Sequence, residues 1–411
     1  MTNLECRTKQ MNLNFYKHSF PILVIIGGSI LLLVSFGIRH SSGLYLIPIS
    51  EHIQSGREVF GFAIAIQFLM IGIGSPIFGA IADKYNSAVA GLYGVIFFLI
   101  GLYMMAQVET SFFLIMSQVI FGFGCAGCGT AVILGAVGKA VTGKNQTLAL
   151  GIVMAAGSLG QFLIVPLTGI LIDLTSWQQS IIYLCFISLI MILFALSLSI
   201  SSDSQEGIDQ VKYSLSQVLN KAFSNKSYVF LTVGFFVCGF HVSFVATHLP
   251  AYLDDLSMPN WIGSWSLALI GLFNVFGTLL FGHLGDSKSK KDLLVVLYSL
   301  RSILFLTFIF LPKTEITIII FASILGILWL STVPLTSGII SVIFGSKYMS
   351  MLYGFTFLSH QVGSFMGSWF GGRLYDFYGS YDVMWWACVF LGFASALMHY
   401  PINENKVTLT N

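Results

Sequence analysis

Two stretches with the same spacing decide the fold: "GAIADKYNS" at residues 79–87 and "GHLGDSKSKK" at residues 282–291. The glycine and the aspartate that begin the first stretch recur in the second as Gly282 and Asp286, at an offset of 203 residues. Similarity at a fixed offset is typical of a chain built from repeated units. The sequence therefore predicts two related halves.

The composition indicates a membrane protein with many spans. Of the 411 residues, 56% are hydrophobic and only 9% are charged, whereas soluble domains carry roughly 25% charged residues. The net charge of +2, without a long basic run, excludes a nucleic-acid-binding surface. The six cysteines are scattered, five of them inside apolar stretches, and predict no disulfide framework.

Long apolar runs separated by polar breaks predict an all-α membrane protein with twelve transmembrane helices in two pseudo-symmetric six-helix bundles. The polar stretch 201–226 divides the chain into an N-terminal bundle at 1–200, a cytoplasmic linker loop and a C-terminal bundle at 227–411. The predicted spans are 20–48, 59–82, 88–107, 111–138, 146–172, 178–200, 227–252, 260–284, 291–311, 315–341, 349–375 and 381–401.

The basic residues orient these spans in the bilayer. Of the 19 lysines and arginines, fourteen fall on the side of the two termini, while the opposite loops hold only Arg57 and Lys313. Cytoplasmic loops are enriched in Lys and Arg. We therefore expect a multi-pass protein of the inner cell membrane, with both termini in the cytoplasm, that works as a monomer.

The stretch at 79–87 resembles the loop motif G-x-x-x-D-[RK]-x-G-[RK]-[RK] of the major facilitator superfamily, through Gly79, Asp83 and Lys84. Within that family the chain is similar to the bacterial monocarboxylate-transporter-like branch, because "KNQTLALGIVMAAGS" at 144–158 partly matches its K-[RK]-x-x-L-A-x-G pattern. The resemblance implies the twelve-helix transporter fold. It also implies a gating role for Asp83, Lys84 and Asp286.

Arg39 is the first candidate for binding a substrate. Helices 1 and 7 match at an offset of 202 residues, which pairs Arg39 with His241 and Pro48 with Pro250. A charged side chain inside a span usually faces a cavity or a partner, and a guanidinium can grip a carboxylate at two points. The alternative is that Arg39 lies in water beyond the end of a shorter span.

Three histidines are candidates for carrying a proton, namely His241, His248 and His360. Histidine titrates near physiological pH, which suits proton coupling in a chain with no Asp or Glu deep in a predicted span. The alternative for each is a hydrogen-bonded core residue. We expect His241 and His360 to contact the substrate as well. Further candidates for substrate binding, each with interhelical hydrogen bonding or packing as the alternative, are Asn274, Tyr45, Gln361 and Trp329.

Other polar residues are expected to be structural. Arg301, about ten residues into helix 9, is expected to form hydrogen bonds within the C-terminal half. Asp173 and Asp376, at the outer ends of helices 5 and 11, are expected to be solvated turn residues.

The sequence thus predicts a secondary transporter that moves a small organic anion, monocarboxylate-like, together with a proton by alternating access. The alternative is an efflux transporter for an apolar metabolite or drug, which the 15% aromatic content would also suit. The partners are the substrate, H+ and the lipid bilayer. No enzyme activity, cofactor or metal site is expected.

Overall fold

The computed structural model describes residues 3–141, 146–201, 215–344 and 349–406. Within these ranges the side chains of 3–20, 83–84, 139, 146–148, 200–201, 215–218 and 349–351 are not described. The described chain is helical nearly throughout and contains no strand.

Polar side chains set the beginnings of many helices. Asn86, Thr110, Ser176, Asn225 and Thr314 each accept a hydrogen bond from a backbone N–H of the first turn, which satisfies a group that the helix cannot pair itself.

The long helices are α1 (Asn3–His40), α3 (Arg57–Lys84), α4 (Ser87–Ala106), α5 (Ser111–Gly127), α7 (Gln146–Leu174), α11 (Lys226–Asp255), α12 (Asn260–Ser287), α13 (Lys290–Phe310), α14 (Glu315–Leu328), α16 (Met349–Tyr378) and α17 (Asp382–His399). The shorter ones are η1 (Ser42–Tyr45), α2 (Leu46–His52), α6 (Thr130–Ala140), α8 (Trp177–Ser188), α9 (Ile190–Leu196), η3 (Ser197–Ser201), α10 (Leu215–Ser224) and α15 (Thr332–Phe344).

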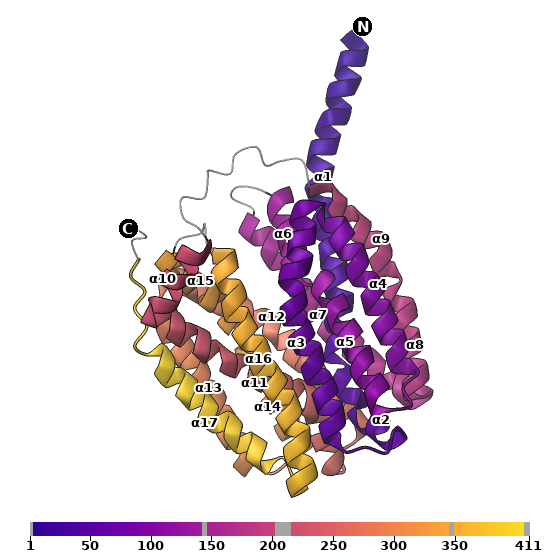
Figure 1. The fold of residues 1–411 in the computed structure, drawn as a ribbon, viewed down its shortest axis with the longest axis vertical. Coiled ribbons are helices and arrows are strands. Elements are labelled where there is room, and N and C mark those ends of the chain that lie inside the picture. Colours follow the sequence, from indigo (N-terminus) through magenta and orange to yellow (C-terminus); the bar gives the residue numbers. More distant parts are fainter. Residues whose placement is uncertain (1–2, 142–145, 202–214, 345–348, 407–411) are drawn as a thin grey trace.

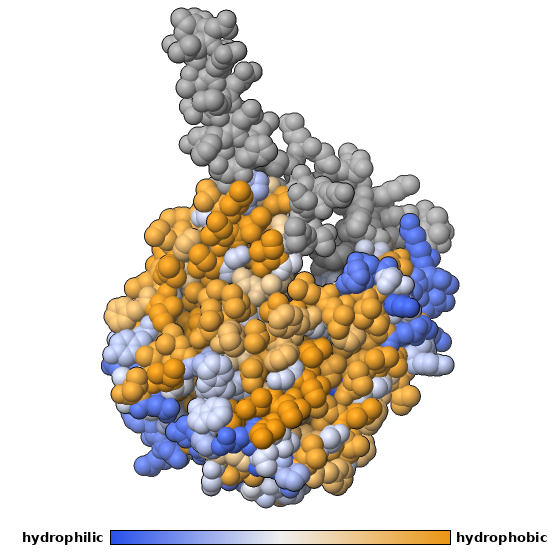
Figure 2. Space-filling view, turned by 180° about the vertical axis from the view of Figure 1, so that it is seen from behind, coloured by the Kyte–Doolittle hydropathy of each residue, from blue (hydrophilic) through white to orange (hydrophobic). Residues whose placement is uncertain are grey.

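These helices form twelve spans across the part of the chain that is described. Eleven segments are long and apolar enough to cross a membrane, and the twelfth is α16, a helix of 30 residues that is rich in glycine and serine. Apolar side chains cover most of the face drawn in Figure 2. The prediction of an all-helical protein with twelve transmembrane helices in two related bundles is confirmed.

The first half comprises α1 to η3 and the second α10 to α17, and matched glycines hold each half together. Gly160 of α7 lies against α1, where an added Cβ would approach the carbonyl oxygen of Leu33 to 1.9 Å. Gly363 of α16 lies against α11 in the same way, with an added Cβ 2.0 Å from the carbonyl oxygen of Phe236. Both pairs are related by the offset of 203 residues, so the repeat extends to backbone contacts between helices.

Two spans are broken at equivalent positions. The fourth span is interrupted between Gly127 and Thr130, and the tenth between Leu328 and Thr332. Transporters commonly build their sites around such interruptions, because the freed backbone groups become available. Both breaks place irregular backbone in the middle of a bundle.

The two halves meet along two helix pairs, α3 with α16 and α7 with α12 (Figure 1). We call the end of the molecule where α3 passes into α4 and α12 into α13 the terminal end, because the described chain begins and finishes toward it (Figure 1). The other end, where α2 turns into α3 and α11 into α12, is the opposite end.

The two halves are in contact from the opposite end to the middle of the molecule, and they separate toward the terminal end. On α3, an added Cβ at Gly72 would lie 3.2 Å from Gln361 of the second half. Gly79 lies seven residues further on the same face, about 10 Å along the helix, and nothing described lies within 4 Å of that position. The face of α16 changes in the same way from Gln361 to Gly354.

The second helix pair repeats this divergence. Gly271 of α12 packs against Gln161 and Ser158 of α7. Eleven residues on, Gly282 again has no described atom within 4 Å of an added Cβ. The same is true of Gly151 on α7, seven residues from Ser158. The halves are therefore closed together at the opposite end and apart at the terminal end.

Candidate functional site

Arg39 is a cation without an acidic partner in the described structure. It lies in the last turn of α1, partly exposed, with its guanidinium carbon 4.5 Å from the centre of the Phe36 ring. Its one hydrogen-bond contact is 3.4 Å from Nη2 to Nε2 of His40, and its Nε is inaccessible to solvent without a partner. The ionisable groups beside it are the thiols of Cys125 and Cys128.

A second unpaired polar group lies close to Arg39. Gln67 of α3 is buried beside Cys125, and its Oε1 has no hydrogen-bond partner among the described residues. Cys125 lies in the last turn of α5 and Cys128 in the break before α6. The first half therefore brings Nε of Arg39 and Oε1 of Gln67, both without a partner among the described residues, near its interrupted helix. In the described part of the chain the buried polar side chains include histidines and Arg301 but no Asp or Glu.

His241 does not share the environment of Arg39, although the offset of 202 residues pairs them. The imidazole is fully buried in the second half, where Nε2 donates to the carbonyl oxygen of Cys388 at 2.9 Å. Its ring packs edge-on against Phe305 at 5.0 Å, and Gly392 lies against it. Arg39 and His241 were both expected to contact the substrate, but the structure does not bring them to one cavity, because α13 and α17 enclose His241.

Tyr45 and Trp329 also make their contacts within one half. The Tyr45 hydroxyl lies 2.9 Å from the hydroxyl of Ser180, inside the first half. Trp329 is fully buried at the break in the tenth span. There its carbonyl oxygen accepts a hydrogen bond of 2.7 Å from Nη2 of Arg301, and Leu328 accepts a second. Arg301 is therefore hydrogen-bonded within the second half, as the sequence predicts.

Asn274 and Gln361 connect the two halves near the point where they diverge. Asn274 donates from Nδ2 to the Ser158 hydroxyl at 3.1 Å, and its Oδ1 accepts from the backbone N–H of Leu330 at 3.0 Å. Gln361 donates from Nε2 to the carbonyl oxygen of Phe68 at 3.1 Å. Both side chains thus hold backbone or hydroxyl groups of the facing half.

His360 lies beside Gln361 and keeps one nitrogen unpaired. Its Nδ1 is 3.0 Å from Oε1 of Gln361, and its ring stacks on Phe357 at 5.6 Å. Its Nε2 is buried without a hydrogen-bond partner among the described residues. This histidine is therefore linked through Gln361 to the interface between the halves.

The predicted gating residues lie at the terminal end. The side chains of Asp83 and Lys84 lie outside the described residues. Asp286 is exposed and has no hydrogen bond to any described group. This placement agrees with the separation of the halves at that end.

The opposite end contains a network of charged residues that the sequence analysis did not identify. Arg57, the first residue of α3, donates from Nη1 and Nη2 to the two carboxylate oxygens of Asp255 on α11, at 2.7 and 2.6 Å. The same guanidinium donates to the Tyr381 hydroxyl at 3.2 Å and lies 3.8 Å from the Tyr375 ring. The side chain of Arg57 is 14% exposed and that of Asp255 28%, so the guanidinium is mostly buried while the carboxylate it pairs with reaches the surface.

Asp376 completes this network by capping a helix of the other half. Its Oδ1 accepts from the backbone N–H of Arg57 at 2.9 Å and its Oδ2 from that of Glu58 at 2.7 Å. A carboxylate at a helix N-terminus is favoured by both the free N–H groups and the helix dipole. Glu58 itself accepts from Arg373 at 3.0 Å. We refer to Arg57, Glu58, Asp255, Asp376 and Tyr381 as the interhalf lock.

The expectation for Asp376 was therefore wrong, because Asp376 caps a helix of the other half. Asp173 is exposed, as expected, and also accepts from Asn260 of the second half at 3.4 Å. The missed signal was the position of the charges. Arg57 and Glu58 open α3, while Asp255 and Asp376 stand near the ends of helices that reach the same end of the molecule.

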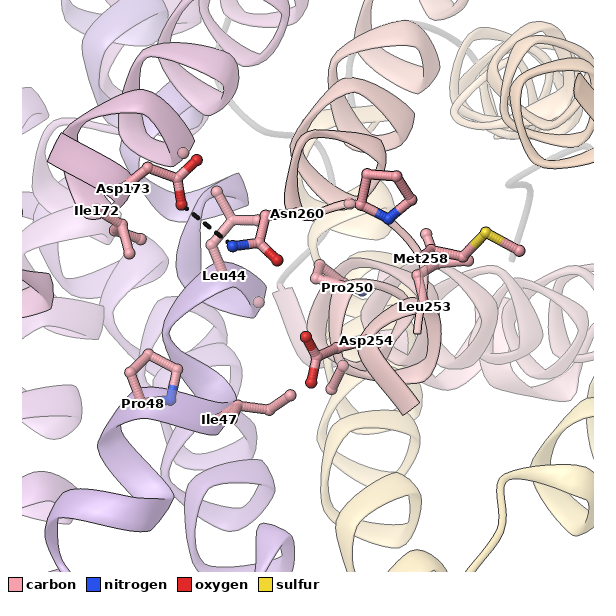
Figure 3. A pocket seen from close by; sticks show the side chains of 15 residues that line it. Leu44, Ile47, Pro48, Ile172, Asp173, Pro250, Leu253, Asp254, Met258 and Asn260 are labelled. Atoms are coloured by element: carbon pink, nitrogen blue, oxygen red, sulfur yellow. Dashed lines mark hydrogen bonds between the residues drawn. The ribbon is translucent and has the colours of Figure 1, made fainter. Parts of the chain in front are cut away.

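A cavity of about 230 Å³ lies beside this network, between the halves. Its walls come from η1, α2 and α7 of the first half and from α11 and α12 of the second (Figure 3). The carboxylates of Asp173 and Asp254 stand on its two sides, and its remaining lining is largely apolar (Figure 3). The cavity is lined by the ends of helices that the two halves bring together.

Three comparisons with known proteins bear on this arrangement. The sequence model of the Major Facilitator Superfamily matches residues 27–368. The chain is 22% identical to the uncharacterized MFS-type transporter YcxA of Bacillus subtilis, over 90% of this chain and 92% of that protein. It is 23% identical to human monocarboxylate transporter 12, over 69% of this chain and 61% of that protein. Among solved structures, the nucleoside transporter NupG superposes with a TM-score of 0.76 at 14% identity, covering 92% of this chain and 99% of that one.

Proposed function

The chain belongs to the Major Facilitator Superfamily, and from that premise we propose that it carries a small organic anion, monocarboxylate-like, together with a proton by alternating access. The relatives and structural neighbours named above are transporters, which favours transport over an enzymatic reaction. Residues 1–200 and 227–411 would be the two moving units, joined by 201–226.

The observation that carries the choice of an anion is the isolated guanidinium of Arg39. A charged group inside a membrane bundle is expensive without a partner, and such groups usually mark the path of a substrate. In the described structure Arg39 contacts no carboxylate, and its Nε is unpaired. A substrate carboxylate would supply the missing negative charge and accept hydrogen bonds in two-point fashion.

The shape of the molecule supports a transport cycle. If the terminal end faces the cytoplasm, as the distribution of basic residues favours, the halves are open to the inside and closed to the outside. The interhalf lock would then be the outer closure. The outward-facing state would require these contacts to break and the faces around Gly79 and Gly282 to come together.

His360 is the candidate for a proton site near the centre of the bundle. Its Nε2 is unpaired, and Gln361 links it to α3 of the other half. No Asp or Glu among the described residues is buried to take that role. Histidine is the side chain whose ordinary charge change lies in the physiological range.

Uptake into proteoliposomes tests the proposal. Radiolabelled lactate or pyruvate should accumulate when the outside is more acidic, by about tenfold per pH unit for one proton. Arg39→Ala should abolish this uptake, Arg39→Lys should retain part of it, and Lys313→Ala, a cation at the opposite end, should leave it unchanged. If a panel of short carboxylates shows no flux while lipophilic compounds are expelled, the anion proposal is wrong and the efflux alternative is favoured.

A further inference from the structure

The interhalf lock extends into the second half through His248, which lies fully buried on α11. Its Nε2 lies 2.7 Å from the backbone carbonyl oxygen of Ser368, and its Nδ1 lies 3.1 Å from the Tyr381 hydroxyl. Gly61 of α3 lies beside the ring, so His248 sits where the first half packs against the second. It is thus a histidine in contact with both halves and with the lock.

When the imidazole of His248 is neutral, the hydrogen bonds through it run in one direction. A guanidinium only donates, so Arg57 donates to Tyr381, and a carbonyl oxygen only accepts, so the proton of the imidazole lies on Nε2. Nδ1 must then accept the proton of the Tyr381 hydroxyl. Burial raises the pKa of the Tyr381 phenol above its ordinary value, so the phenol keeps that proton. In the closed lock a neutral His248 therefore satisfies both the Tyr381 hydroxyl and the Ser368 carbonyl.

A proton on Nδ1 would disturb this chain in two ways. It would turn Nδ1 from an acceptor into a donor, so the buried Tyr381 hydroxyl would lose the acceptor of its proton. It would also add a second positive charge next to Arg57 in a site screened from water, where like charges repel strongly. Both effects act on the closed state and disappear when the halves separate at the opposite end.

Other charged groups face His248, and they belong to several helices. The charged and titratable groups near His248 at this end include Arg57 and Glu58 on α3, Arg373, Tyr375 and Asp376 on α16, Tyr381 in the turn before α17, and Tyr252, Asp254 and Asp255 on its own helix.

We propose that His248 is a proton-binding site that controls the interhalf lock: the lock closes around the neutral imidazole and opens around the protonated one. This inference deepens the proposed proton coupling and rests on the proposed alternating-access cycle, but not on the nature of the substrate. An acidic medium at the opposite end would then favour the state in which that end is open. A low pH outside would thus both supply the proton and open the substrate site toward that side.

The distance between the halves at the opposite end tests this inference in the empty protein. Spin labels carried by unnatural amino acids at the exposed positions of Glu51 and Tyr378 would report that distance. With an ordinary histidine pKa near 6.5 in the open form, the ratio of open to closed molecules should rise about tenfold from pH 8 to pH 5.5. The ratio rises as the pH falls because only the open form binds the proton, so protonation draws molecules into that form.

Variants assign this rise to one residue. His248→Gln should change the ratio less than about twofold over the same range, while His241→Gln, a matched buried histidine away from the lock, should keep the tenfold rise. Asp255→Asn weakens the Arg57 fork, so it populates both states and keeps the ratio measurable. A wild-type protein that stays closed is consistent with the proposal only if Asp255→Asn responds to pH.

Two outcomes would overturn the inference. One is a ratio that does not depend on pH in either the wild type or Asp255→Asn. The other is a tenfold rise that persists in His248→Gln. Because no anion is present, failure of carboxylate uptake would not affect this result, and a negative result here would leave the role proposed for Arg39 intact.

Discussion

Two arginines inside transmembrane helices, Arg39 and Arg301, have different surroundings. Arg301, in the second half, is fully buried, and its Nη2 donates to the carbonyl oxygens of Leu328 and Trp329 at the break in the tenth span. Arg39, in the first half, is partly exposed and has only a 3.4 Å contact to the neighbouring His40. The same side chain thus supports a broken helix in one half and stands unpaired near a broken helix in the other.

This difference shows how two halves of the same fold can use an arginine in different ways, one to stabilise a broken helix and the other to bind a substrate. Arg301 donates from Nη2 to two backbone carbonyls and so supports the fold, and its Nε and Nη1 are sealed inside the second half without a partner among the described residues. A guanidinium without acceptors contributes little to folding and keeps its donors for a substrate. Stability and ligand binding should therefore respond oppositely when each arginine is replaced.

The largest expected effect is on stability at Arg301. Arg301→Ala removes the donors of two buried carbonyl oxygens and leaves a void, which should lower the free energy of unfolding by about 3 kcal/mol. Arg39→Ala should lower it by less than about 1 kcal/mol, since it removes one contact with an aromatic ring. Thermal unfolding in detergent measures both. Equal losses for the two variants would contradict the distinction.

The next effect is on stabilisation by a ligand. A short carboxylate at 100 times its dissociation constant should stabilise the wild type by about 2.7 kcal/mol. Arg39→Ala should lose this shift, because the charge that the anion pairs with is gone. His241→Gln should keep it, because His241 is sealed against Phe305 and Cys388. A shift that survives in Arg39→Ala would place the anion elsewhere.

The sequence predicts the helices better than it predicts their partners. Apolar runs and the offset of 203 residues are local or repeated signals, so the spans and the matched glycines could be read directly. The offset places Arg39 and His241 at equivalent backbone positions, but it does not say which neighbours fill the space around each side chain. Phe305 and Cys388 enclose His241 and belong to helices far along the chain.

The interhalf lock shows the same limit at the ends of the helices. Arg57 and Asp376 each look like loop charges when they are considered alone, and solvation is the ordinary outcome for such residues. They meet only because the two halves close at that end, 319 positions apart in the sequence. A prediction of this contact needs the conformational state as well as the fold.

A smaller effect tests whether the two halves depend on the same close packing. Gly160→Ala would push a methyl group into the backbone of Leu33, and Gly363→Ala into that of Phe236. Each should destabilise the protein by about 2 kcal/mol, as overpacking of a tight contact does. Gly151→Ala, at a position with no described neighbour within 4 Å, is the matched control. A loss in one half alone would show that the duplicated contacts have diverged.

The smallest effect concerns the amide that supports the second break from the opposite side to Arg301. Asn274→Ala removes an acceptor from the Leu330 N–H and a donor to Ser158, and should destabilise the protein by about 1 kcal/mol. Ser158→Ala removes only the bond between the halves and should have about half that effect, near the average of about 0.6 kcal/mol for hydrogen bonds between membrane helices. Thermal unfolding of both variants separates the two roles. If they lose the same stability, Asn274 acts through the interface alone, and Arg301 is then the main polar support of the broken helix.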